Sequence, residues 1–140
     1  GLDGVDIDYE YFYENNQRNA AQRGFNMGSQ AQTFLREATI GLRKSLPAGS
    51  IVTHAPMDPD VVPGTAYYNV LVDLASSLDF LMPQYYNGYI RPVTDFAGAL
   101  SHFSALSNDM FGGDRNKVVF GFALTNAVVT TSMALRLRLP

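Results

Sequence analysis

The sequence contains no cysteine, which excludes a disulfide, a thiolate nucleophile and a Cys-ligated zinc site. No apolar run approaches the ~18 residues that a membrane-spanning helix needs, and the first residues lack the basic and apolar regions of a signal peptide. The formal net charge is −3 and no basic cluster occurs. Nucleic acid and anionic membranes are therefore poor candidates for the main partner.

Two nucleotide-binding patterns, GxGxxG and GxxxxGK[ST], are also missing. An open doubly wound sheet usually binds its ligand at such a Gly-rich turn, so their absence argues against that architecture. What is present is a chain of 140 residues, 46% hydrophobic and 16% charged. This composition is typical of one globular unit with a sizeable core.

Patterns of two periods alternate along the chain. Strand-type runs are expected at residues 2–12, 50–56, 79–87 and 117–124, and helical runs at 29–46, around 70–78 and from about Thr94. Ser29 and Gln32 have capping-box spacing at the start of the first helix, which should end before Pro47. The order βαβαβαβ predicts an α/β fold with a parallel sheet, as in a doubly wound sheet or a (β/α) barrel.

The first strand is unusual because a run rich in Val, Ile, Tyr and Phe carries acids. Side chains two apart on a strand point the same way, so Asp6, Asp8 and Glu10 should share one face and Val5 and Ile7 the other. In a barrel the acids would point inward toward the rim at the carboxyl ends of the strands, where active sites lie. Such a group of carboxyls suits acid–base chemistry.

The third strand supports the same location. By the same alternation, Met82, Gln84 and Tyr86 share a face, which places an amide and a phenol near the acids. Both groups could bind a polar substrate.

At these residues the sequence resembles a known family. DGVDIDYE, with Asp3, Asp6, Asp8 and Glu10 in the spacing DxxDxDxE, resembles the strand-four signature of the family 18 glycoside hydrolases, the chitinases and their relatives. QYYN, residues 84–87, resembles the strand-six segment of the hevamine-like plant and fungal branch. The resemblance runs from Gly1 to about Leu124 and implies barrel strands four to seven.

The resemblance implies a partial (β/α)8 TIM barrel, incomplete in this chain, because a whole barrel takes roughly 250 residues. Residues 1–124 would form the partial catalytic domain and residues 125–140 an atypical C-terminal tail. By this resemblance, strands one to three and eight would be missing, and the sequence contains no Trp, the residue that the family usually places on strand eight.

The resemblance also implies a mechanism. Glu10 would protonate the glycosidic oxygen while the substrate's own 2-acetamido carbonyl attacks the anomeric carbon, a variant of retaining hydrolysis known in this family. Asp8 would orient the acetamido group, Asp6 would support Asp8 through a shared proton, and the Tyr86 hydroxyl would hold the acetamido oxygen. Gln84, Asn87 and Met82 are the expected substrate-binding residues.

The implied substrate is a β-1,4-linked N-acetylglucosamine polymer or oligosaccharide, or the chitobiose core of an N-glycan. No metal and no organic cofactor is required, and the family resemblance implies a secreted, extracellular protein. A sugar-binding lectin on the same fold and an endo-β-N-acetylglucosaminidase remain as alternatives. Lectins of the family usually lack the final Glu or a paired Asp. The presence of Asp6, Asp8, Glu10 and Tyr86 therefore favours catalysis.

Other residues have simpler interpretations. A calcium site at the acids is disfavoured, because an EF-hand loop needs Gly at its sixth position. Asp3 has the opposite parity to the other acids and is expected to be structural. Tyr11, Phe12 and Tyr13 are expected to pack more than to bind sugar, and His54 and His102 lack the partners of a metal site or triad.

Overall fold

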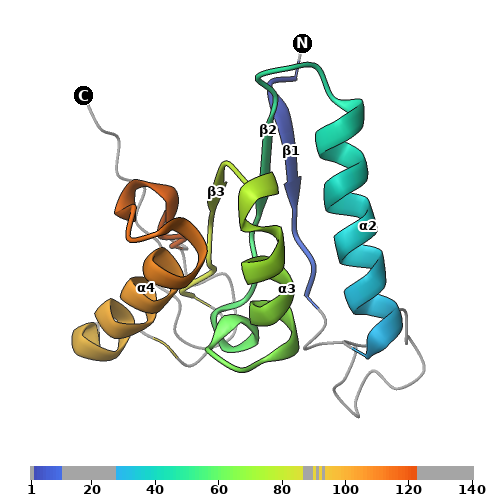
Figure 1. Ribbon diagram of the computed structural model, residues 1–140. Coiled ribbons are helices and arrows are strands. Elements are labelled where there is room, and N and C mark those ends of the chain that lie inside the picture. Colours follow the sequence, from blue (N-terminus) through green and yellow to red (C-terminus); the bar gives the residue numbers. More distant parts are fainter. Residues whose placement is uncertain (1, 11–27, 87–89, 91, 93, 123–140) are drawn as a thin grey trace, which may run out of the picture.

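The computed structural model describes residues 2–10, 28–86, 90, 92 and 94–122. Strands and helices alternate along this part of the chain, as the sequence predicts (Figure 1). In chain order the elements are β1 (Gly4–Ile7), α2 (Ser29–Ser45), β2 (Ile51–His54), the 3-10 helix η2 (Asp58–Val61), α3 (Ala66–Leu74), η3 (Ala75–Ser77), β3 (Phe80–Leu81), α4 (Phe96–Phe111) and η4 (Arg115–Lys117).

The strands form a parallel sheet in the order β1-β2-β3. Asp6 pairs with Thr53, and Thr53 pairs with Phe80, so three adjacent strands place these residues in one row. Residues 118–121 continue the sheet beyond β3 through two isolated parallel bridges, Leu81 to Val118 and Gln84 to Gly121. Four neighbouring parallel segments therefore follow one another in chain order.

Within the described residues, the fourth predicted strand therefore pairs with the segment of β3 through isolated bridges and does not form a continuous ladder with it. Pro83 explains part of the interruption, because proline has no N–H to donate to a neighbouring strand. Hydrogen bonds resume around it: the Val119 N–H donates to the Leu81 carbonyl at 2.8 Å, and the Gly121 N–H to the Pro83 carbonyl at 3.0 Å.

Helix α2 begins and ends close to the predicted positions, with Pro47 just beyond its end. The predicted capping box is wrong, however. The cap residue is Gly28, without a side-chain cap hydrogen bond, and Ser29 is already the first helical residue. Because Ser29 lies inside the helix, its hydroxyl is not in the cap position, and the Gln32 N–H donates to the Gly28 carbonyl at 3.1 Å.

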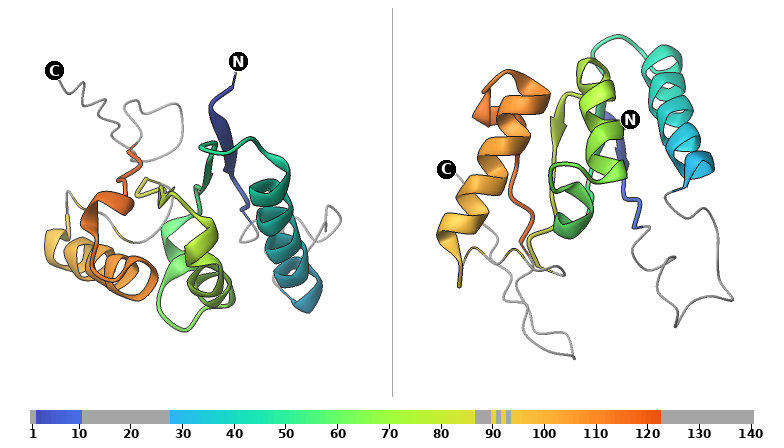
Figure 2. Two further views of the ribbon diagram at one scale, coloured as in Figure 1. Left: turned by 45° about the horizontal axis from the view of Figure 1, so that its top comes forward. Right: turned by 60° about the horizontal axis from the view of Figure 1, so that its bottom comes forward.

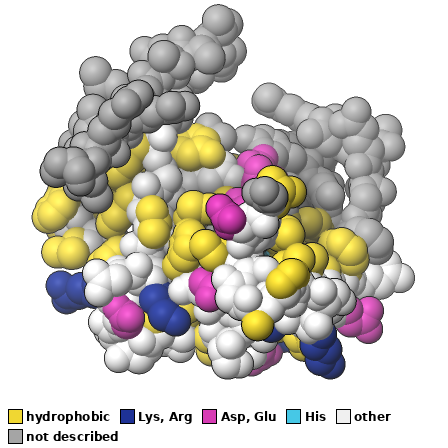
Figure 3. All heavy atoms as spheres, turned by 90° about the horizontal axis from the view of Figure 1, so that it is seen from above, with side chains coloured by type: hydrophobic (Ala, Val, Ile, Leu, Met, Phe, Trp, Pro, Cys, Tyr) yellow, Lys and Arg dark blue, Asp and Glu magenta, His cyan; other side chains and the backbone are white. Residues whose placement is uncertain are grey.

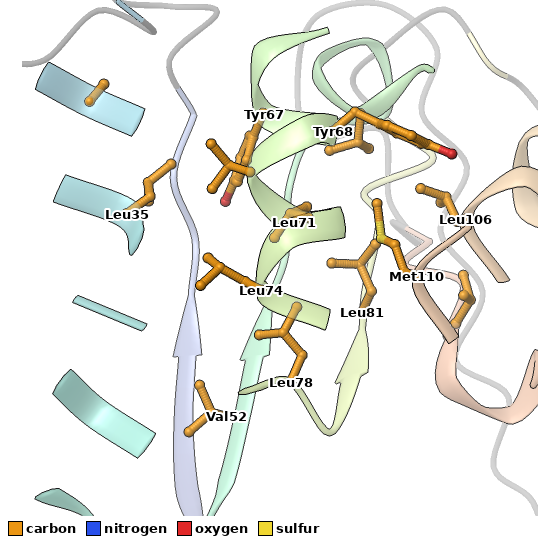
Figure 4. Close-up of a cluster of buried hydrophobic side chains, with 14 residues drawn as sticks. Leu35, Val52, Tyr67, Tyr68, Leu71, Leu74, Leu78, Leu81, Leu106 and Met110 are labelled. Carbon is orange, nitrogen blue, oxygen red and sulfur yellow. The ribbon is translucent and has the colours of Figure 1, made fainter. Parts of the chain in front are cut away.

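The helices lie together on one face of the sheet (Figures 1 and 2). Between these two layers lies the hydrophobic core, to which β2, β3, α2, α3 and α4 all contribute (Figure 4). Its fully buried members include Leu35, Val52, Leu71, Leu81 and Leu106. Burial of each such side chain contributes roughly 1.5–3 kcal/mol, so the helix layer is firmly joined to the sheet.

The opposite face of the sheet is more open. Ile51 and Val119 are 39% and 43% exposed, and Phe80 and Met82 are half-buried. Seen from above, hydrophobic and acidic side chains share the visible surface, and Lys and Arg lie in the half that carries the helices (Figure 3). Over the described residues, no helix is both long and apolar enough to cross a membrane.

Candidate active site

The acidic side chains of the first strand lie as the alternation predicts. Ile7 and Tyr9 pack against the hydrophobic core, whereas Asp6 and Asp8 are exposed and Glu10 is half-buried. Strand β1 ends at Ile7, so Asp8 and Glu10 follow its carboxyl end. In a parallel sheet this is the edge at which ligands usually bind.

The Gln84 side chain joins two of these acids. Its amide nitrogen Nε2 lies 2.8 Å from Asp8 Oδ1 and 3.0 Å from Glu10 Oε1, and it also donates to the Ala55 carbonyl at 2.7 Å. The side chain is buried, with 4% of its surface exposed. The structure therefore brings together three predicted site residues, Asp8, Glu10 and Gln84, from two strands that are not neighbours.

The backbone of Gln84 is held from both sides. Its N–H donates to the Pro56 carbonyl at 2.8 Å, and the residue forms parallel bridges with Met57 and with Gly121. Gly121 is needed for this close approach, because a Cβ there would lie 2.9 Å from the Pro83 carbonyl oxygen. Gln84 is thus at a fixed position in the middle of the sheet.

The third acid, Asp6, has a partner that sequence reasoning missed. The Thr53 hydroxyl donates to Asp6 Oδ1 at 2.5 Å, and Thr53 is 2% exposed. The two residues are paired in the register of β1 and β2. Strand alternation could have placed Thr53 on the face opposite to the apolar Val52, but its pairing with Asp6 depends on the register of the two strands.

The other predicted site residues lie on the same segment as Gln84 or outside the described residues. Met82 and Tyr86 are half-buried and lie two residues before and after Gln84 on the same segment. Asn87 lies outside the described residues, as do Tyr11, Phe12 and Tyr13. Asp3 is exposed, and its backbone carbonyl accepts from the Ile51 N–H at 2.9 Å, a structural contact between β1 and β2.

His54 of β2 joins the sheet to helices α2 and α3 through its two ring nitrogens. The Thr39 hydroxyl donates to the Leu35 carbonyl, so it accepts from His54 Nε2 at 2.9 Å, while His54 Nδ1 accepts from the Tyr67 hydroxyl at 2.8 Å. Burial lowers the pKa of His54 to about 4. It is therefore a neutral structural group at pH 7, as expected.

Histidine 102 is held in the same way. Its Nε2–H donates to the Val61 carbonyl at 2.8 Å, and its Nδ1 accepts from the Tyr85 hydroxyl at 2.8 Å. Burial lowers the pKa of His102, although the bond to Val61 works in the opposite direction. Burial also raises the pKa of the Tyr85 hydroxyl, with a smaller effect of Asp58. Tyr85 therefore anchors the segment next to Gln84 to α4.

No group of three or more His, Cys, Asp or Glu residues that could hold a metal ion occurs in the part of the chain that the structure describes. What the described residues offer is a cluster of carboxyls and neutral donors at the carboxyl edge of a parallel α/β sheet. This arrangement is suited to proton transfer to and from a polar substrate.

The fold is similar to that of a solved protein, a GH18 chitinase from Pseudoalteromonas aurantia. The two chains are 28% identical, with a TM-score of 0.65, over 90% of this chain and 44% of that one. No family model and no curated protein matches the sequence.

This similarity supports a relationship to the GH18 glycoside hydrolases in general. The chain spans less than half of the length of that chitinase. The hevamine-like branch and the assignment to particular barrel strands remain predictions.

Proposed function

We propose that this chain provides the acidic half of the active site of a retaining glycoside hydrolase that cleaves β-1,4-linked N-acetylglucosamine. The observation that carries the proposal is the meeting of Asp8, Glu10 and Gln84 at the carboxyl edge of the sheet. The similarity to a GH18 chitinase over 90% of the chain supports it.

In the proposed reaction Glu10 donates a proton to the glycosidic oxygen, and the acetamido carbonyl of the substrate attacks the anomeric carbon. The charged ring that forms in this step is stabilised by Asp8, which also orients the acetamido group. Asp6, held by Thr53, supports Asp8, and the Tyr86 hydroxyl holds the acetamido oxygen. Water then opens the cyclic intermediate, with Glu10 taking back a proton.

The substrate is proposed to be chitin or a chitooligosaccharide, bound in part by Met82, Gln84 and Asn87. The sheet of four parallel segments is proposed to be strands four to seven of a (β/α)8 barrel, with residues 1–124 as this partial domain and 125–140 as a tail. An extracellular location, where chitin occurs, is part of the same proposal. No step requires a metal or an organic cofactor.

The decisive experiment replaces the proton donor in a complete barrel that contains this chain. Glu10→Gln should lower kcat for chitotetraose hydrolysis by roughly 10²-fold or more, because the amide keeps the shape but cannot donate an acidic proton. Binding of chitooligosaccharide, measured by calorimetry, should stay within about threefold of the parent, a difference of less than ~1 kcal/mol.

Two outcomes contradict the proposal. Turnover by Glu10→Gln equal to that of the parent would remove Glu10 from the proton-donor role. A parent protein that binds the oligosaccharide without cleaving it would be a lectin.

A further inference from the structure

We infer that Gln84 is a positioning residue, which orients the carboxyl groups of Glu10 and Asp8 before substrate binds. The inference deepens the proposed function and rests on it. In this role Gln84 would act on the reaction through Asp8 and Glu10, in addition to the sugar contact that the sequence predicts.

The direction of these hydrogen bonds follows from the chemistry of the amide group. The Gln84 nitrogen can only donate, so Glu10 Oε1 and Asp8 Oδ1 must both accept from it, at 3.0 Å and 2.8 Å. A protonated Glu10 therefore carries its proton on Oε2. Likewise, Asp8 Oδ2 is the oxygen left for a substrate N–H. One amide thus selects the reactive oxygen of both acids.

The Gln84 side chain is also held rigidly. Three acceptors, on Asp8, Glu10 and Ala55, share the two N–H bonds of this amide at 2.7–3.0 Å. The Gln84 backbone is bridged to Met57 and Gly121. A buried donor fixed in this way keeps its direction while charge develops on the acids, which is the requirement for electrostatic preorganisation.

The group that holds the two acids carries no charge. A Lys or Arg at this position would favour the ionised form of Glu10 and so oppose proton donation. The neutral amide of Gln84 fixes the geometry of the carboxyls without adding a positive charge. None of the Lys and Arg residues that the structure describes belongs to the segments that carry Asp8, Glu10 and Gln84. They lie on α2 or η4: Arg36, Arg43, Lys44, Arg115 and Lys117.

The Gln84 side chain reaches across the sheet to the acids. Gln84 and the acids lie on segments that flank β2, so the amide must pass over the residues that follow β2. The residue at this point is Ala55, whose carbonyl accepts the third hydrogen bond. A small side chain here leaves room for the amide to cross. The arrangement thus depends on three adjacent strands at once.

The contact is tested directly on the 140-residue chain by NMR. The side-chain amide signals of Gln84 are assigned by their loss in Gln84→Met. Both should exchange slowly with solvent and should shift in Asp8→Ala and in Glu10→Ala, while Asp3→Ala, which removes an exposed acid of opposite parity, leaves them in place. Amide signals with the exchange rate and shift of a free glutamine would overturn the inference.

The role in the reaction is tested in the complete barrel by separating kcat from KM. Gln84→Met, which keeps the volume and loses the donor, should lower kcat by roughly 10²-fold, a larger effect than the rise in KM from loss of the proposed sugar contact. Gln30→Met on the exposed face of α2 should leave both unchanged. A higher KM at unchanged kcat would instead make Gln84 a sugar contact and overturn the positioning role.

The two tests also separate this inference from the proposed function. If the parent protein hydrolyses no chitooligosaccharide, the proposed function fails, whereas the amide signals still report whether Gln84 holds the two acids. If the parent is active and the Gln84 signals do not respond to loss of the acids, only the positioning role fails.

Discussion

The hydroxyl of Thr53 donates a hydrogen bond to Oδ1 of Asp6 at 2.5 Å. The pair joins a residue that is 2% exposed to an acid that faces solvent, across two adjacent parallel strands. Since Oδ1 of Asp6 accepts from Thr53, the proton that Asp6 and Asp8 share in the proposed mechanism would lie on the other oxygen of Asp6. In that mechanism Thr53 would fix the direction in which Asp6 supports Asp8.

Thr53→Val should therefore lower kcat in the complete barrel by about tenfold or more, because a hydrogen bond to a charged group is worth roughly 1.5–3 kcal/mol. Thr53→Ser keeps the hydroxyl and should retain most of the activity. Steady-state kinetics of both variants with chitotetraose provides the measurement. Equal losses in Val and Ser variants would mean that packing at position 53, and not the hydroxyl, matters.

Tyr86→Phe should lower kcat more than it weakens ground-state binding. Its hydroxyl is proposed to hold the acetamido oxygen during attack, so its contribution should be larger in the transition state than in the bound substrate. Kinetics and calorimetry on the same preparation separate the two effects. A change confined to KM would indicate a lectin-like contact at Tyr86.

The positions of these groups show which parts of the site the sequence can predict. The common face of Asp6, Asp8 and Glu10 follows from the two-residue period of a strand, which needs no knowledge of the rest of the fold. The bond from Gln84 to Glu10 joins residues 74 positions apart across an intervening strand. Its formation depends on the register of three strands, which one sequence does not determine.

The same distinction applies to the fold. Helix α2 was predicted well because its apolar residues repeat at helical spacing and Pro47 follows its end. The predicted cap was wrong by one residue. Ser29 and Gln32 have capping-box spacing, but the helix already begins at Ser29 and its cap is Gly28. Local chemistry alone does not determine which residue is the first in the helix. Strand β3 is shorter than predicted because Pro83 removes one N–H from the ladder.

Acid should destabilise the fold through His54. Its pKa is lowered from 6.5 to about 4 by burial, so between these pH values the unfolded chain binds a proton that the folded chain does not. The free energy of unfolding should then fall as pH falls through this window, by about 3 kcal/mol from this group. Urea unfolding at pH 7, 6, 5 and 4 gives the measurement.

Replacement of His54 by Gln supplies the control for this effect. The amide can accept from Tyr67 and donate to Thr39 but does not titrate, so His54→Gln should show a flatter pH dependence than the parent. Parallel curves for the two proteins would assign the acid sensitivity to other groups.

A methyl group at position 121 should disturb the backbone that positions Gln84. A Cβ there would lie 2.9 Å from the Pro83 carbonyl oxygen and 3.6 Å from Gln84 Cα, so Gly121→Ala must shift the backbone that holds Gln84. The expected loss of stability is roughly 1–3 kcal/mol.

Gly41→Ala in α2 is the matched control. A Cβ added at Gly41 would have no neighbour within 4 Å, so stability should rise by about 0.5–1 kcal/mol. Urea denaturation compares both, and a Gly121→Ala variant as stable as the parent would contradict the close approach.

The open face of the sheet should govern the solution behaviour of the chain. Ile51 and Val119 are 39% and 43% exposed on that face, and exposed apolar surface next to unpaired strand edges favours association. The double variant Ile51→Thr, Val119→Thr keeps β-branched side chains that suit strands, so its stability should stay within about 0.5 kcal/mol of the parent. The double variant should bind less of a hydrophobic dye and remain monomeric to higher concentration in light scattering.

The control is Leu106→Thr, at a fully buried position. It should instead lower the free energy of unfolding by about 2 kcal/mol or more and increase dye binding. Unchanged association of the double variant would mean that this face is not the surface through which the chains associate.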